Sequence, residues 1–256
     1  MVRDRLRQSA RYGGVVAGFL ICAGAQVGRG QELVSAPAPH AEVQPAQAAQ
    51  AQAQVNLALQ QRLLGLVPNF FVVYTPHPVP LTTKQKFELA LRSEVDPMAL
   101  AGAGVSAAYG QWQDDPKSFR QGSEGYFKRV GATYGANFIG IITGDAIVPS
   151  ILKQDPRYFY KGTGSLRSRF FYAVSNSFIC MGDNGHWQVN VSQPMGSLTT
   201  AGITELEYPP SDRFGIGRVF RDFVISEFAA GGENVFQEFF SRRFTFKLGG
   251  RRELNR

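Results

Sequence analysis

The densest cluster of residues with chemical potential in this sequence is the text KQDPRYFYKGTGSLRSR, residues 153–169. Four of its cations lie around a glycine-containing bend: Arg157, Lys161, Arg167 and Arg169. Guanidinium and ammonium groups beside hydroxyls are typical of sites that bind phosphates or lipid headgroups. The alternative is a solvated loop between two helices, in which Asp155 caps a helix. We therefore expect either an anion site or an ordinary interhelical loop here.

A second candidate is the single carboxylate in an apolar stretch, Asp145, within the text IGIITGDAIVPSI. Burial in such surroundings disfavours the charged form of a carboxyl group and raises its pKa. One interpretation is a proton-active buried acid. The other is a structural acid that pairs with a cation on a neighbouring helix. Either interpretation predicts that Asp145 lies inside the fold.

Other kinds of site find no support in the sequence. The histidines, His40, His77 and His186, lack metal-binding spacing, and no cysteine cluster accompanies them. No Gly-x-Ser-x-Gly nucleophile motif occurs, and the text GTGSLRS matches no phosphate-binding loop. Cys180, alone once the first 25 residues are removed, is expected to be a small buried apolar residue. The sequence thus predicts no metal and no cofactor, and it favours a non-enzymatic role without deciding the point.

A stripe of small residues precedes Asp145 and recurs at every fourth position: Ala132, Ala136, Gly140 and Gly144. On a helix these residues share one face, so two backbones can approach closely there. A shorter stripe of alanines spans residues 99–107. We expect the two stripes to form a tightly packed antiparallel helix pair. The alternative is a membrane hairpin, since the run 132–152 has about the length of one span.

Helical patterns dominate the elements that must position these residues. Capping residues, apolar spacing and Asp-Pro pairs predict helices near residues 83–95, 98–112, 126–153, 165–181, 195–207 and 216–244, the last interrupted at Gly231–Gly232. Prolines make residues 67–81 an extended strap, and Asp183-Asn184-Gly185 predicts a tight turn before a short strand. The fold class is therefore mainly α: a close-packed helical bundle with Gly/Ala stripes and a short β-hairpin or extended strap.

Composition divides the chain into four parts. Residues 1–25 combine arginines with a short apolar run and a small-x-small site, which indicates a cleaved signal peptide; the alternative is an uncleaved anchor. Residues 26–56 are rich in Ala, Gln and Pro and are expected to be a disordered tether. Residues 57–245 form the helical domain, and residues 246–256 form a basic tail.

The formal net charge of +7 is unevenly distributed. Residues 61–241 contain 16 basic and 16 acidic side chains, so the surplus lies near the two ends of the chain. The last fifteen residues alternate Phe and Leu with basic residues before Arg251, Arg252 and Arg256. We expect this segment to attract an anionic lipid surface or an acidic envelope polymer. An exported chain seldom meets nucleic acid, so no nucleic-acid partner is expected.

A resemblance rests on the texts VPSILKQDPRYFYKGTGSLRSRFFYAVS and GDNGHWQVNVSQPMGS. Together they are similar to a group of exported bacterial proteins to which no activity is assigned. The likeness covers residues 60–245 and implies export to the bacterial envelope, with no catalytic residue to carry over.

These observations lead to one leading expectation and one alternative. The leading expectation is an exported protein of the periplasm or cell envelope, with a structural, membrane-associating or partner-binding role. The alternative is a lipid- or small-molecule-active enzyme that uses the polar cluster around residues 155–169.

Overall fold

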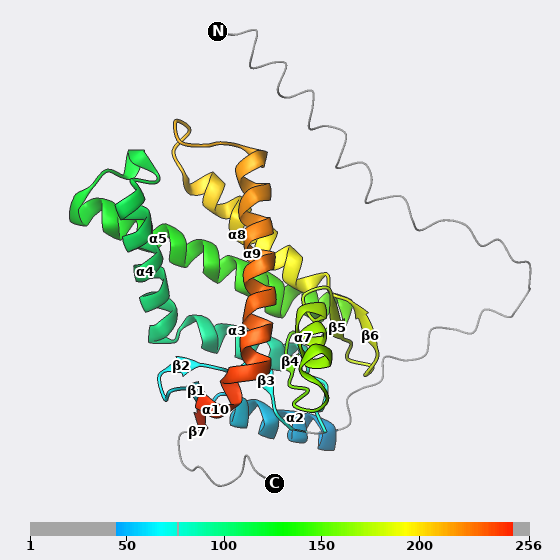
Figure 1. Ribbon diagram of the computed structural model, residues 1–256. Coiled ribbons are helices and arrows are strands. Elements are labelled where there is room, and N and C mark those ends of the chain that lie inside the picture. Colours follow the sequence, from blue (N-terminus) through cyan, green and yellow to red (C-terminus); the bar gives the residue numbers. More distant parts are fainter. Residues whose placement is uncertain (1–44, 76, 248–256) are drawn as a thin grey trace, which may run out of the picture. The chain divides into compact units, whose positions relative to one another are not determined.

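The computed structural model describes residues 45–75 and 77–247, and these are mainly helical (Figure 1). The predicted fold class is confirmed. The longer helices are α2 (Pro45–Ala58), α3 (Thr83–Glu94), α4 (Pro97–Gln113), α5 (Gly122–Ile141), α7 (Leu166–Ser175), α8 (Ser192–Glu207) and α9 (Ile216–Phe236). The shorter helical segments are the 3₁₀ turn η2 (Lys117–Phe119), the π-helical turns η3 (Ile142–Ile147) and η4 (Gln237–Ser241), and α6 (Val148–Leu152) and α10 (Arg242–Phe244).

Short strands join segments that are distant in sequence. Strand β1 (Gln61–Leu63) lies between β2 (Val67–Pro68) and β7 (Thr245–Lys247), and both pairings are antiparallel. Strand β3 (Val72–Val73) pairs in parallel with β4 (Tyr158–Phe159). Strands β5 (Ile179–Met181) and β6 (Trp187–Val189) form an antiparallel hairpin. These pairings supply the extended strap and the hairpin expected from the sequence.

Side-chain caps explain where several helices begin. The Asp96 carboxylate accepts a hydrogen bond from the Met98 amide at 3.0 Å, and Pro97 occupies the first turn of α4. The other two Asp-Pro pairs do not start an α-helix in this way. Pro116 precedes the short turn η2, and Asp155 lies in an extended segment before β4.

The small-residue stripe of α5 and η3 brings two helix backbones together. Gly144 faces Gly196 of α8 so closely that a Cβ on Gly144 would lie 3.0 Å from the Gly196 Cα. A Cβ on Gly140 would collide with the Thr200 side chain. The partner of this half of the stripe is therefore α8. Helix α4 also packs against α5 and buries Ala103 and Ala107 of its own stripe. The expected pairing of α4 with α5 therefore occurs, but the Gly140–Gly144 part of the longer stripe packs on α8 instead.

Several expected boundaries are wrong. The helix expected over residues 165–181 ends at Ser175, and Ile179–Met181 form strand β5 instead. Residues 246–247, assigned to the tail, belong to strand β7. Residues 45–56, assigned to a tether, belong to helix α2, which buries Ala51, Val55 and Ala58 against the neighbourhood of α3. Helix α9 also continues through Gly231–Gly232 without a break. The signal peptide, residues 26–44 of the tether and residues 248–256 of the tail lie outside the described residues.

Charged side chains lie deep in this fold. The side chain of Lys86 on α3 is 1 % exposed. Its Nζ donates to the Asp183 carboxylate at 2.8 Å and to the Pro149 carbonyl at 3.1 Å. A buried ammonium group needs such partners, because desolvation without them costs several kcal/mol. This contact connects α3 to the turn of the β5–β6 hairpin.

Candidate functional site

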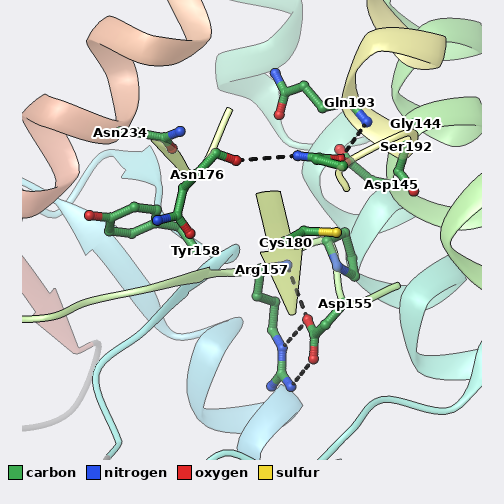
Figure 2. A pocket seen from close by; sticks show the side chains of 12 residues that line it. Gly144, Asp145, Asp155, Arg157, Tyr158, Asn176, Cys180, Ser192, Gln193 and Asn234 are labelled. Carbon is green, nitrogen blue, oxygen red and sulfur yellow. Dashed lines mark hydrogen bonds and ion pairs between the residues drawn. The ribbon is translucent and has the colours of Figure 1, made fainter. Parts of the chain in front are cut away.

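Two of the four predicted cations, Arg157 and Arg169, form ion pairs with buried carboxylates. Arg157 pairs with Asp155 at 2.6 Å, and its guanidinium also donates to the Val79 carbonyl at 2.8 Å. Figure 2 shows that the Arg157 guanidinium contacts both carboxylate oxygens of Asp155. Asp155 therefore positions Arg157 and does not cap a helix.

Arg169 has an equally specific partner in Glu238 of η4. The Glu238 carboxylate is fully buried and accepts hydrogen bonds from Arg169 Nε at 2.7 Å and Tyr158 Oη at 2.8 Å. It also accepts from the Lys161 and Gly162 amides at 3.0 and 2.9 Å. Burial and the neighbouring Glu238 carboxylate raise the pKa of Tyr158, so its hydroxyl stays a donor. Every lone-pair direction of Glu238 thus meets a donor.

These contacts leave little positive charge for an anion. Lys161 Nζ donates to Ser168 Oγ at 2.8 Å and lies over the Tyr172 ring. Arg167 is exposed. Two of the four predicted binding residues are therefore neutralised inside the fold, and the geometry favours a structural connection over an anion site. The anion site itself stays a prediction.

A cavity elsewhere in the described residues has a different character. It measures about 700 Å³ and lies among α3, the α5–η3 region, α8 and α9. Three carboxylates line it: Glu94 at the end of α3, Asp145 in η3 and Glu233 in α9. Most of the other polar lining groups are amides and hydroxyls, among them those of Asn137, Thr200, Asn234 and Gln237. The cavity is therefore acidic, with apolar side chains such as Phe70, Phe71 and Ile141 in the rest of its lining.

The acids lack cationic partners. Neither Glu94 nor Asp145 has a side-chain hydrogen bond or ion pair within residues 45–75 and 77–247, so the expected pairing of Asp145 with a neighbouring cation is not found there. Burial raises the pKa of Asp145 to about 7, and the Glu233 and Glu94 carboxylates add to this rise. Burial also raises the pKa values of Glu94 and Glu233, which a hydrogen bond from Gln237 opposes at Glu233.

A smaller pocket of about 50 Å³ adjoins this cavity and shares Asp145, Tyr158, Gln193 and Asn234 with it. Figure 2 shows that Asp145 lies beside Ser192 and Gly144, apart from the Arg157–Asp155 pair. Cys180 also lines the small pocket, and burial raises the pKa of its thiol to about 11. The thiol is therefore protonated at neutral pH and unreactive.

The described part of the chain contains no group of three His, Cys, Asp or Glu side chains that could hold a metal ion. Sequence reasoning found Asp145 but missed Glu94 and Glu233. The signal at Glu233 is the one that drew attention to Asp145, a lone acid in an apolar helical run, here FAAGGENVF. Glu94 gives no such signal, because it ends an ordinary amphipathic helix.

Comparison with known proteins gives no match: no family model, no curated protein sequence and no solved structure corresponds to this chain. The resemblance to exported bacterial proteins therefore stays a prediction. Fold and site together define a mainly α-helical protein with an acidic cavity that opens to solvent.

Proposed function

We propose that this is a membrane-associated protein of the cell envelope, whose outer helix faces contact lipid. The observation that carries the proposal is the placement of its apolar side chains. Large apolar residues are exposed on helix after helix, including Leu100, Val105, Trp112, Phe127, Ile151, Phe171, Leu206, Ile216, Phe220 and Phe228. Soluble domains bury most such residues and expose their charges. Here the buried set is rich in charged groups and alanines.

The long helix formed by α5, η3 and α6 supports the same proposal. Gly122–Leu152 is long and apolar enough to cross a membrane by length and composition. Its most apolar 18-residue window has a mean hydropathy of 1.4, yet only 28 % of it is buried. The core helix of a soluble protein would be mostly buried. The apolar side chains of this helix thus lie largely on the outside.

Lipid is favoured over a single protein partner because the exposed apolar residues occur on helices from α4 to α9. Helices α5 and α9 run in clearly different directions (Figure 1), so we propose lipid contact along helix faces, without a parallel spanning bundle. The arginine-rich, apolar first 25 residues support export to the envelope. The basic tail adds attraction to anionic lipid.

Vesicle flotation of the full-length protein tests this proposal. At about 1 M salt, where the Debye length is about 3 Å, only apolar contact survives. We expect the protein to float with neutral phosphatidylcholine vesicles under these conditions. The triple variant Val105→Ser, Trp112→Ser, Phe228→Ser should partition at least about tenfold less, because each buried apolar side chain contributes roughly 1.5–3 kcal/mol.

The matched control replaces an exposed polar pair, Glu124→Gln with Lys128→Gln, and should float like the wild type. Flotation only with anionic vesicles at low salt would show attraction through the basic tail alone and would overturn the lipid-contact proposal. Equal flotation of the triple variant would overturn it as well.

A further inference from the structure

The open cavity among α3, the α5–η3 region, α8 and α9 has a lining of one charge sign. Glu94, Asp145 and Glu233 contribute carboxylates, and the described lining residues include no Lys, Arg or His. A concave site lined by charges of one sign concentrates ligands of the opposite sign, because its low-dielectric walls focus the field. The cavity therefore attracts cations.

Unpaired hydrogen-bond acceptors in the same cavity give a second, independent indication. Glu94 is 4 % exposed, and its carboxylate has no partner among the described residues. Gln237 is 7 % exposed, and its Oε1 is buried without a hydrogen bond. Buried polar groups are nearly always paired, since an unpaired one costs about 1–3 kcal/mol. Both groups lack a donor, which a protonated amine would supply.

The kind of cation follows from the size and composition of the cavity. A volume of about 700 Å³ falls within the range of small-molecule sites, roughly 300–1,000 Å³. The carboxylates come from separate elements, and the described residues offer no three-ligand metal cluster. Phe70, Phe71 and Tyr158 also line the cavity and suit contacts with an alkyl chain or an ammonium group.

We infer that the cavity binds a linear organic polyamine, with its protonated amines on the Glu94, Asp145 and Glu233 carboxylates and the Gln237 carbonyl. This inference is argued from the cavity lining and does not depend on the proposed lipid contact. Vesicle flotation tests the lipid contact, and amine binding tests the cavity, so either one can fail alone.

Proton release gives the inference a distinctive signature. In the empty cavity burial holds the pKa of Asp145 near 7, so this carboxyl is partly protonated at neutral pH. A bound polyamine stabilises the charged form, and Asp145 then loses its proton. The groups known to act on Asp145 in the empty state are the Glu94 and Glu233 carboxylates, and both oppose its ionisation. Binding at pH 6.5–7 should therefore release protons.

Isothermal titration of the full-length protein with spermidine, in a neutral detergent, is the test. Spermidine should bind saturably, and the measured heat should change with the ionisation enthalpy of the buffer. The uncharged chain 1,8-octanediol should not bind, and Mg²⁺ at equal ionic strength should not displace spermidine. Absence of spermidine binding, or displacement by Mg²⁺, overturns the inference.

A double variant, Glu94→Gln with Glu233→Gln, should weaken spermidine binding at least tenfold. Both replacements keep the side-chain size, and Glu94→Gln also removes the cost of burying a charge, so the fold should persist, which circular dichroism checks. The control Glu124→Gln removes an exposed carboxylate outside the cavity and should leave binding unchanged. Spermidine binding of equal strength by the folded double variant would place the amine elsewhere and sink the proposed site.

Discussion

Asp145 lies in the π-helical turn η3, where the Glu233 and Glu94 carboxylates oppose its ionisation. Its pKa rises from an ordinary value of 3.8 to about 7 in the folded protein. Between these two values the folded state keeps a proton that the unfolded state has released. The free energy of unfolding therefore falls as the pH rises through this window, and the loss is complete above pH 7.

Replacing Asp145 by Asn should remove this pH dependence. We expect Asp145→Asn to raise the melting temperature at pH 8 by several degrees, since 1 kcal/mol shifts it by about 2–4 °C in a domain of this size. At pH 4 the carboxyl is already neutral in the fold, so the two proteins should melt alike. Thermal denaturation at both pH values measures the difference. A shift of the same size at pH 4 and pH 8 would contradict the burial argument.

At the scale of single residues, some site residues could be predicted from the sequence and others could not. An acid inside an apolar run, as at Asp145, stands out. The cation cluster at 157–169 looked available for an anion because Glu238, the partner of Arg169, lies 69 positions further along the chain. Only the fold shows that the guanidinium is already paired. The place of Glu94 in the cavity is likewise not predictable from local sequence, because Asp145 and Glu233 lie on elements distant from it in the chain.

At the scale of elements, the contact between α5 and α8 depends on glycine. A methyl group on Gly140 would meet Thr200 and the Gly196 carbonyl, whereas one on Gly131 of the same helix would meet nothing within 4 Å. Gly140→Ala should therefore destabilise the protein by about 1–3 kcal/mol. Gly131→Ala should stabilise it by up to about 1 kcal/mol through helix propensity. Denaturant midpoints of the two variants measure this, and stability changes of the same sign would refute the close packing.

Local patterns predicted the kinds of element better than their limits. Capping residues and apolar spacing gave the fold class, and the turn at Asp183-Asn184-Gly185 gave the hairpin. Helix α2 was missed because its Ala/Gln composition resembles a tether, although alanine favours helix and Val55 packs in the core. Helix α9 tolerates Gly231–Gly232 because its tertiary packing outweighs a cost of about 1 kcal/mol per glycine.

At the scale of the whole molecule, the Arg169–Glu238 pair joins α7 to the C-terminal turn η4. Arg169→Ala would leave a fully buried carboxylate without its cation, and breaking such a pair typically costs about 3–5 kcal/mol. Arg167→Ala, on an exposed neighbour, should stay within about 0.5 kcal/mol of the wild type. Urea denaturation compares them. Equal stability of both variants would show that the pair does not hold these elements together.

Composition alone could not predict which way the apolar side chains face. A hydrophobic content of 44 % with 20 Phe indicates a sizeable core. In the described residues, however, Trp112 and Phe228 are 78 % and 79 % exposed, while Glu238 is fully buried. Periodicity finds an apolar stripe on a helix but does not say whether protein or lipid covers it. Only the arrangement of the helices in space shows that many large apolar side chains lie on the outside.

The enclosed ammonium group of Lys86 gives the chain a built-in reporter. Acylating reagents need a free, neutral amine, and this nitrogen is held by Asp183 and by a main-chain carbonyl with almost no solvent contact. Lys128, half exposed on α5, is open to the same reagent. Labelling at the first lysine therefore follows how often α3 separates from the hairpin turn, while labelling at the second follows reagent supply. The ratio of the two labelling rates therefore measures local opening of the fold at lysines that the chain already contains.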